Sequence, residues 1–585
     1  MLKDCLKVFR HLLDTEGTSI VEDSHIPADG TYLLVHLERP EEPEIVEMKY
    51  DKKNEKFECE GSSILGKIRK MDYYSTLLEM NKPIDDKKVI HSNNYLSFSL
   101  KKENLLPGGK LDSERINSYY EVLMNPHRKY EKKPKAEALY TKVEEELGVP
   151  DKSKAEQCKE WIEKHVFELE QWDVDLSKKE YIKIFFDAPM EDYQRECKRY
   201  QIPNIYNSDK NIRETNGITY GVPNNNMGLN SKKPYLEHKT RPEPAPYLID
   251  SEEVFLQNQF FEYLYGFSSM GKYNVFVDLD EMKIEAYSKM PSRDINGIYL
   301  RIRKGKNEAE IVECENNACY RTKLPRNFAY TNFLEVDLLN LKQDVPNYDG
   351  RILKTSELAA IIDSVLFSKY LSSNYFTDAG DIKIKRTGLK QSLLYARNSL
   401  FRWLYLGDER TVKKVLDQAT MIIIKGNIEE GFILKAIHQF NLRCSLQQYF
   451  SKEGETGMGE RIKNIKENLR QKVNSKETLY MDSDEEYYFA VGQLVSYFIS
   501  LNKSKKKMHS LANPFLNAKS NEIIKQKLMQ FFKKYNYMIE SSSLRFNNLY
   551  EMIVSFETSG KVNQDMILAG YLSSSLLYEK KEENK

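Results

Sequence analysis

The chain has 585 residues, 30% of them charged, with a mean hydropathy of −0.63 and a formal net charge of zero. No apolar run approaches the roughly 18 residues of a spanning helix, which excludes a membrane protein. The charged N-terminus does not resemble a signal peptide, and seven scattered cysteines suit a reducing compartment, so we expect a cytoplasmic protein of several domains.

Proline and charge divide the chain near residue 350. All prolines but Pro514 lie in residues 1–350, and a proline costs about 3 kcal/mol inside a helix. Residues 351–585 carry 36 Lys/Arg against 26 Asp/Glu, which leaves 52 against 62 for the first part. We therefore predict an α+β N-terminal body followed by an all-α C-terminal helical bundle with a basic, polyanion-binding surface.

The first 350 residues alternate short strands with helices. Short apolar or alternating runs predict strands at residues 32–37, 44–49, 88–91, 95–100, 181–186, 273–279, 297–303 and 309–313. Apolar spacings of three and four predict helices at residues 62–80, 136–147, 155–169, 190–200 and 251–265. No regular βα repeat appears, so the order favours α+β organisation over a doubly wound sheet.

The loop of residues 217–241 has the composition of a nucleic-acid contact. Its asparagines can donate to and accept from base edges, and its basic side chains can reach phosphates. The base-contact candidates are Asn224, Asn225, Asn226 and Asn230, and the phosphate-contact candidates are Lys232, Lys233, Lys239 and Arg241. An ordinary Asn/Gly-rich surface turn is the alternative interpretation.

A catalytic site is harder to place. Residues 275–281 (VFVDLDE) would put Asp278 and Asp280 on one face of a strand, so a metal-dependent nucleic-acid-processing enzyme is an alternative to a binding protein. Cys314 and Cys319, which we expect in a hairpin loop, have no paired motif to complete a zinc site. We expect no enzyme activity, no metal and no cofactor.

Nine helices are expected beyond residue 354. They cover residues 355–370, 389–405, 409–425, 429–450, 459–475, 484–502, 520–538, 543–558 and 563–578. A Gly/Glu-rich break before Met458 predicts a connecting region of residues 351–457 and a separate bundle of residues 458–585. That bundle carries 20 Lys/Arg against 15 Asp/Glu.

Lysines interleave with aromatic residues in this bundle. Bases can stack on the rings while ammonium groups meet phosphates, as in proteins that bind single strands. Equally, the aromatic residues have helix-core spacing, and a lysine run can be a solvated helix face. The candidates are Lys503, Lys505, Lys506, Lys507, Lys533 and Lys534, the last two beside Tyr535 and Tyr537.

Several long phrases resemble one known family. Residues 487–498 (YYFAVGQLVSYF), 505–519 (KKKMHSLANPFLNAK), 532–537 (FKKYNY) and 567–572 (ILAGYL) resemble the C-terminal region of the large subunit of type I-B CRISPR Cascade complexes. The loop of residues 228–241 (GLNSKKPYLEHKTR) with 245–248 (APYL) resembles its central segment. Some relatives have a Cys-x-x-Cys element upstream of this loop that is missing here, so no zinc role is implied.

The resemblance implies a non-catalytic subunit of a prokaryotic antiviral ribonucleoprotein. It would bind guide RNA, target double-stranded DNA and the displaced strand, recognise the protospacer-adjacent motif, and aid DNA opening during R-loop formation. Its protein partners would be the backbone and small subunits and a recruited helicase-nuclease. A purely structural scaffold is a further alternative.

In the same family the C-terminal region resembles a separate small subunit and can be made by internal translation. Met458 is the expected internal start, because Met481 would discard a helix.

Overall fold

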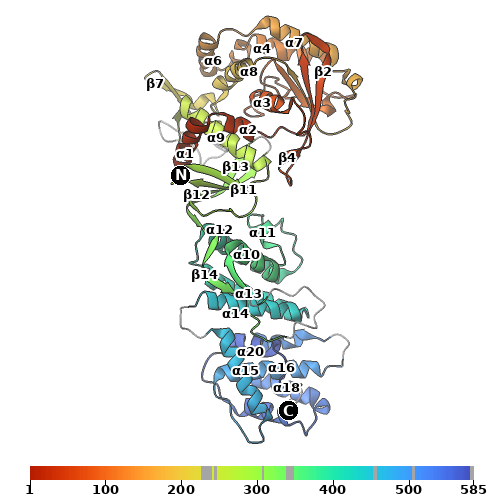
Figure 1. Ribbon diagram of the computed structural model, residues 1–585, viewed down its shortest axis with the longest axis vertical. Helices are drawn as coiled ribbons and strands as arrows, with labels where there is room; N and C mark the ends of the chain where they lie inside the picture. Colours follow the sequence, from red (N-terminus) through yellow and green to blue (C-terminus); the bar gives the residue numbers. More distant parts are fainter. Residues whose placement is uncertain are drawn as a thin grey trace. The chain divides into compact units, whose positions relative to one another are not determined.

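The computed structural model describes residues 1–224, 240, 242, 247–305, 308–336, 348, 350–451, 457–503 and 507–579. The chain forms two compact units (Figure 1), the first comprising Met1–Met290 with Asn296–Ala318 and the second comprising Pro291–Ile295 with Cys319–Lys585. Both predicted domain boundaries, at residues 350 and 457, lie inside the second unit.

The first unit contains a four-stranded sheet in the order β2-β1-β6-β5. Its strands are β2 (Arg39–Met48), β1 (Gly30–His36), β6 (Tyr181–Phe186) and β5 (Ser97–Lys101). β1 runs parallel to β6, and both outer strands are antiparallel to their neighbours. β1 is buried over nearly its whole length, as expected for a central strand that is apolar on both faces. Packed with this sheet are helices α3 (Leu65–Ser75), α4 (Ser113–Met124), α7 (Lys152–His165) and α8 (Met190–Gln201).

A second sheet in the same unit has the order β11-β10-β12-β13. Its strands are β11 (Lys283–Tyr287), β10 (Asn274–Asp278), β12 (Ile295–Lys304) and β13 (Ala309–Tyr320). Helices α1 (Leu2–Glu16) and α9 (Ser251–Ser269) share its core, where the rings of Phe9 and Phe260 lie 5.5 Å apart. The remaining elements of this unit are α2 (Ser19–Ser24), α5 (His127–Tyr130), α6 (Pro134–Leu147), β3 (Tyr50–Asp51), β4 (Lys56–Phe57), β7 (Arg213–Thr215), β8 (Ile218–Gly221) and β9 (Ile249–Asp250).

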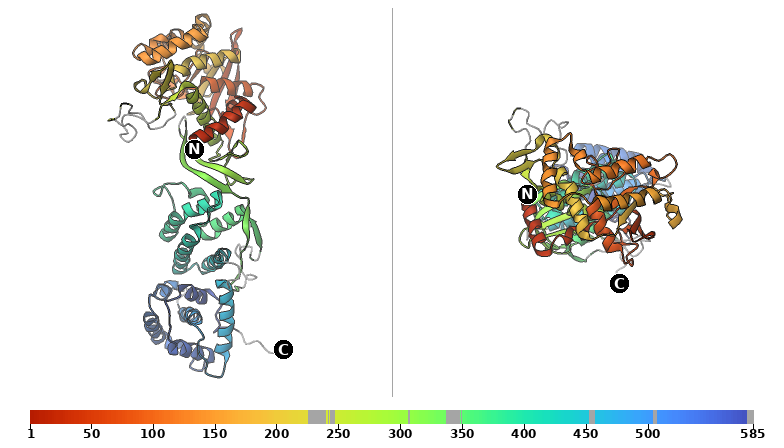
Figure 2. Two further views of the ribbon diagram at one scale, coloured as in Figure 1. Left: turned by 90° about the vertical axis from the view of Figure 1, so that its left-hand side faces the viewer. Right: turned by 90° about the horizontal axis from the view of Figure 1, so that it is seen from above.

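In its described parts the second unit is mainly helical, with the antiparallel pair β14 (Lys323–Ala329) and β15 (Arg351–Lys354). The helices of its first part are α10 (Thr355–Ile361), α11 (Leu371–Asn374), α12 (Thr387–Leu406), α13 (Val412–Glu429) and α14 (Ile433–Tyr449). The bundle that follows (Figure 2) contains α15 (Met458–Asn474), α16 (Asp484–Ser500), α17 (Asn513–Leu516), α18 (Asn521–Tyr535), α19 (Leu544–Ser555) and α20 (Gln564–Leu572).

Two glycines let α16 and α20 approach closely. A Cβ atom at Gly570 would lie 1.9 Å from the carbonyl oxygen of Phe489, and one at Gly492 would lie 2.2 Å from that of Ile567. Both glycines lie in the sequence phrases that resemble the Cascade subunit. Their role in this structure is therefore backbone packing between two buried helices.

The predicted fold class is confirmed: an α+β N-terminal region is followed by a run of helices. Every helix predicted beyond residue 354 has a counterpart, but α10 ends at Ile361 and α20 at Leu572, well short of the predicted ends at residues 370 and 578. Helices α1 and α4 were not predicted. The predicted strand at residues 88–91 is wrong, because the backbone N–H groups of Val89 and Ile90 donate to the Asp85 carboxylate. Cys314 and Cys319 lie on strand β13 and not in a loop.

No helix in the described parts of the chain combines the length and apolar character needed to cross a lipid bilayer.

Candidate nucleic-acid interface

Most of the predicted loop contacts lie outside the described residues. These are Asn225, Asn226, Asn230, Lys232, Lys233, Lys239 and Arg241, together with Lys505 and Lys506 of the second cluster. The described candidates are Asn224 in the first unit and Lys503, Lys507, Lys533 and Lys534 in the second.

Asn224 is buried where the structure describes it. It follows β8, its backbone N–H donates to the carbonyl of Ile205 at 2.8 Å, and the residue is only 7% exposed. It borders a cavity of the first unit, and its side-chain oxygen has no hydrogen-bond partner among the residues that the structure describes. In this arrangement the side chain faces the protein interior, away from any exposed base-reading surface.

The other four candidates lie at the ends of two parallel helices. Near the start of both helices, Tyr487 Oη of α16 donates to Asn521 Oδ1 of α18 at 2.5 Å. Near their ends, the ring of Phe498 stacks on that of Tyr535, with centroids 6.3 Å apart. Because both helices end at the same side of the bundle, the lysines that follow α16 and those that end α18 lie at one end of it.

We call Lys503, Lys507, Lys533, Lys534 and Tyr537 the basic end of the bundle. All four lysines are exposed, and Tyr537 is 73% exposed. The sequence left open whether the aromatic residues belong to the core or can stack with bases. The structure assigns the two tyrosines of this segment to different environments. Tyr535 is 4% exposed and belongs to the core, whereas the Tyr537 ring is available to a ligand.

Lysines at this end also match the electrostatics of the helices. Lys507 Nζ donates to the carbonyls of Ser500 and Asn502 at 2.7 and 2.5 Å, which satisfies carbonyls that the end of α16 leaves free. Two parallel helices add their negative dipole ends here, so part of the lysine charge is balanced by the protein itself. Lys507 is therefore a helix-capping residue, and Lys503, Lys533 and Lys534 are the better candidates for phosphate contacts.

Sequence reasoning missed Tyr578, which extends this surface. Its hydroxyl lies 2.8 Å from Ser500 Oγ, its ring is 5.5 Å from that of Tyr497, and it is 57% exposed. No motif marks this residue, because only the tertiary fold brings the segment after α20 to the end of α16. A second exposed ring beside the lysines is the arrangement that lets successive bases stack.

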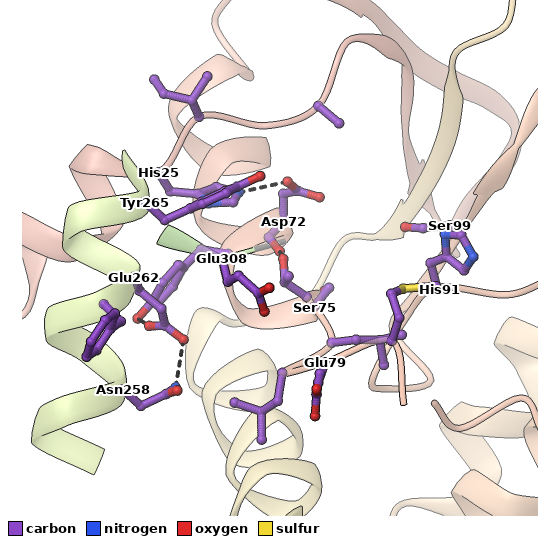
Figure 3. Close-up of a pocket in the computed structure, with 18 of the residues that line it drawn as sticks. His25, Asp72, Ser75, Glu79, His91, Ser99, Asn258, Glu262, Tyr265 and Glu308 are labelled. Atoms are coloured by element: carbon purple, nitrogen blue, oxygen red, sulfur yellow. Dashed lines mark hydrogen bonds and ion pairs between the residues drawn. The ribbon is translucent and has the colours of Figure 1, made fainter. Parts of the chain in front are cut away.

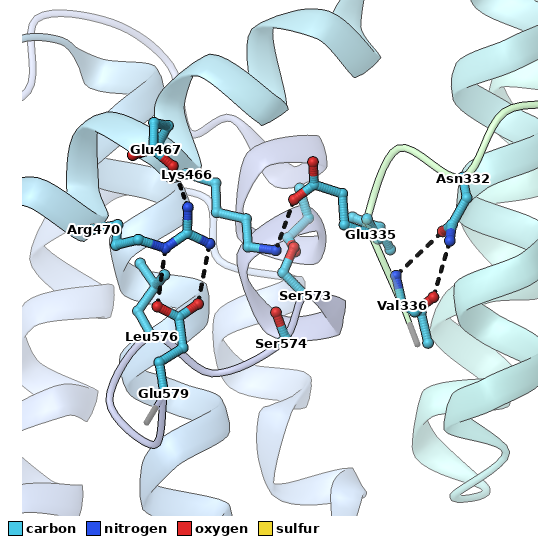
Figure 4. Close-up of polar contacts among 12 residues, drawn as sticks. Asn332, Glu335, Val336, Lys466, Glu467, Arg470, Ser573, Ser574, Leu576 and Glu579 are labelled. Carbon is cyan, nitrogen blue, oxygen red and sulfur yellow. Dashed lines mark hydrogen bonds and ion pairs between the residues drawn. The ribbon is translucent and has the colours of Figure 1, made fainter. Parts of the chain in front are cut away.

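Two basic residues of helix α15 are engaged in internal contacts (Figure 4). Lys466 is buried and lies 3.2 Å from the Glu335 carboxylate, and Arg470 makes two hydrogen bonds to Glu579 at 2.9 and 3.1 Å. The α15 side of the bundle therefore uses these two positive charges to hold other segments of the unit, and the basic end remains the candidate interface.

Helix α15 begins at the predicted internal start. Met458 is its first residue, follows Gly457, and is 9% exposed in the bundle core. Gly459 packs against Phe333, since a Cβ atom there would lie 2.2 Å from the ring. Met481 is also buried and precedes α16, after the whole of α15. A product starting at Met458 would keep α15 intact.

The carboxylates proposed for metal catalysis do not share a strand. Strand β10 ends at Asp278, which is 4% exposed and accepts the backbone N–H groups of Asp280 and Glu281 at 3.1 and 3.0 Å. The expectation that Asp278 and Asp280 lie on one strand face is thus wrong. Asp278 stabilises the β10–β11 turn, and no cluster of three metal-ligating side chains occurs among the described residues.

The chain matches no protein-family model, no curated protein and no solved structure. The relationship to the Cascade subunit stays a prediction from the sequence phrases.

Proposed function

We propose that this protein is the non-catalytic large subunit of a type I-B CRISPR Cascade. In this role it recognises the protospacer-adjacent motif in double-stranded DNA, aids opening of the duplex and recruits the helicase-nuclease. The proposal rests on the sequence phrases of the central loop and the C-terminal bundle. The structural observation that supports a nucleic-acid role is the basic end of the bundle.

The geometry of the basic end suits a single strand better than a duplex groove. Lys503, Lys533 and Lys534 are exposed at the same end of the bundle as the exposed rings of Tyr537 and Tyr578. Stacking on aromatic rings is worth about 1–3 kcal/mol per base and tolerates any sequence. We therefore assign the displaced DNA strand to this surface, and motif recognition to the loop that begins at Asn224.

The reconstituted complex tests the proposal. Its binding is measured with and without this chain across a library of duplexes with different flanking motifs. We expect strong discrimination among motifs only when the chain is present, since base pairing with the guide cannot read the flank. Equal discrimination without the chain would contradict the proposal.

We also propose that residues 458–585 are made as a separate small subunit. The start of α15 at Met458 supports this, because the product would begin with a complete helix. A Met458→Leu substitution should remove the short C-terminal product on an immunoblot, while Met481→Leu should leave it. Persistence of the same product in the Met458→Leu variant would exclude this start.

A further inference from the structure

A partly enclosed cavity of about 250 Å³ lies in the first unit (Figure 3). Helices α3 and α9, strand β6 and the start of β13 contribute to its wall. The titratable side chains that border it are His25, Asp72, Tyr73, Glu79, His91, Tyr181, Lys183, Glu262, Tyr265 and Glu308.

Two basic side chains of the cavity bond to one carboxylate. Asp72 is 2% exposed, and it accepts hydrogen bonds from His25 Nε2 at 2.8 Å and from Lys183 Nζ. Burial alone would raise the pKa of Asp72, but Lys183 and His25 lower it to about 2. His91 adds no fixed charge, because burial lowers its pKa.

Three further carboxyl groups make no direct ion pair in the described parts of the chain; the basic group that acts on Glu79 is Lys82, whose Nζ donates to the carbonyls of Asn204 and Tyr206. None of the ion pairs within the described ranges includes Glu79, Glu262 or Glu308. Glu262 accepts from Tyr73 Oη at 2.6 Å and from Asn258 Nδ2 at 2.9 Å, and burial nevertheless raises its pKa to about 7. Burial and then the charge of Glu79 raise the pKa of Glu308.

An independent observation points to a ligand that donates hydrogen bonds. Asn224 borders the same cavity, is 7% exposed, and has a buried Oδ1 without a partner. A buried acceptor without a donor is destabilising, and no donor among the described residues of this wall reaches Asn224 Oδ1. The rings of Phe261 and Tyr265 also line the cavity and can contact an alkyl chain or a cation.

We infer that this cavity binds a small organic cation with two or more ammonium groups, such as an aliphatic diamine. Each ammonium group supplies three donors and a positive charge, which Glu79, Glu262, Glu308 and Asn224 Oδ1 can accept. The apolar side chains of Leu77 and Leu78 face the methylene chain. A phosphate-bearing ligand is disfavoured here, because the excess carboxylates repel it.

Equilibrium dialysis of the full chain against radiolabelled putrescine tests the inference. We expect one bound putrescine per chain in the wild type and at least a tenfold weaker affinity in the Glu79→Gln/Glu308→Gln variant. The matched control is Glu252→Gln, which removes one charge from an exposed position on α9, the helix that carries Glu262. It should bind as the wild type does.

Asn224→Ala provides a second, charge-neutral test, and we expect a loss of threefold to tenfold in affinity. Putrescine binding that is absent from the wild type, or that Glu252→Gln weakens as much as the cavity variants do, would overturn the inference. Equal retention of adenosine monophosphate and putrescine would also overturn it, since a cation site should exclude the nucleotide.

Discussion

The first unit and the C-terminal bundle place their charges in opposite ways. The cavity of the first unit is lined by carboxyl groups, and among those that the structure describes Asp72 is the one that bonds directly to basic side chains, Lys183 and His25. The bundle buries aromatic and aliphatic side chains and leaves lysines exposed at the ends of α16 and α18. The zero net charge of the chain is therefore the sum of two differently organised regions.

This difference separates the responses of the two regions to solution conditions. Buried carboxyl groups respond mainly to pH, because burial shifts their pKa values and salt screens them little. Exposed lysines stay charged over the physiological pH range and respond mainly to salt. The predictions below change one region while the other serves as a reference, in order of decreasing effect.

The largest effect is expected from breaking the buried ion pair of the first unit. Asp72→Asn leaves Lys183, whose side chain is 12% exposed, without its countercharge, and such a loss costs about 3–5 kcal/mol. Urea unfolding is followed by tryptophan fluorescence in a Trp403→Phe background. The signal then comes from the first unit, because Trp161 and Trp172 both lie in it. Lys49→Gln, which breaks an exposed pair with Glu58, should lower the stability far less than Asp72→Asn does, because solvent screens this pair. Similar costs for both variants would contradict the account.

Glu262 should make the first unit less stable at high pH. Its pKa in the folded protein lies near 7, above the ordinary 4.5, so the folded state holds a proton that the unfolded state loses. Stability is then lost as the pH rises from about 4.5 to 7, and the full penalty applies above 7. The neutral Glu262→Gln variant should match the wild type at pH 4 and exceed it by roughly 2–3 kcal/mol at pH 8.

This comparison uses urea unfolding without added amine, and Glu252→Gln is the control that should show no such pH dependence. A stability difference between Glu262→Gln and the wild type that is the same at pH 4 and pH 8 would exclude a titrating Glu262.

A smaller effect is expected where the bundle meets the segment before it. Gly459→Ala places a methyl group against the Phe333 ring, and such overpacking typically costs about 1–3 kcal/mol. Hydrogen exchange should show faster exchange in α15 and unchanged exchange in α9. Gly426→Ala is the matched control, because a Cβ atom there meets nothing within 4 Å. Equal changes in hydrogen exchange in Gly459→Ala and Gly426→Ala would show that Phe333 does not pack against Gly459.

The sequence was most informative where local pattern decides the structure. Low proline content and apolar spacing predicted the C-terminal helices, because local periodicity and helix-breaking residues set their limits. The strand at residues 88–91 could not be excluded, since its apolar residues bond to Asp85 through the backbone. The cavity was also beyond prediction, because Asp72, Asn224 and Glu262 are distant in sequence and no motif connects them.

The basic end was predicted in part. Lysine runs pointed to Lys533 and Lys534, but only the parallel packing of α16 and α18 brings them to the same end as Lys503. The burial of Tyr535 and the exposure of Tyr537 depend on how α18 ends, which helix periodicity alone leaves ambiguous.

A charge-matched comparison sharpens the role of the basic end. Lys533→Ala/Lys534→Ala should weaken binding of single-stranded DNA about tenfold, because two phosphate contacts are lost. The control Lys519→Ala/Lys561→Ala removes two exposed charges near the starts of the same helices. Lys519 precedes α18, and Lys561 lies near the start of α16 because the backbone N–H of its neighbour Gly560 donates to Asp484. It should bind nearly as the wild type does. Equal losses of DNA affinity in the two double variants would indicate that the DNA is attracted by net charge alone.

The most direct test of nucleic-acid binding is the salt dependence of single-stranded DNA binding by the full chain, measured by fluorescence anisotropy. Three or four phosphate contacts to a single strand predict an affinity loss of roughly 20- to 50-fold between 50 and 200 mM salt, with a shallower slope for Lys533→Ala/Lys534→Ala. Absent or salt-insensitive DNA binding, combined with normal assembly onto partner proteins, would contradict the account and leave a purely structural scaffold.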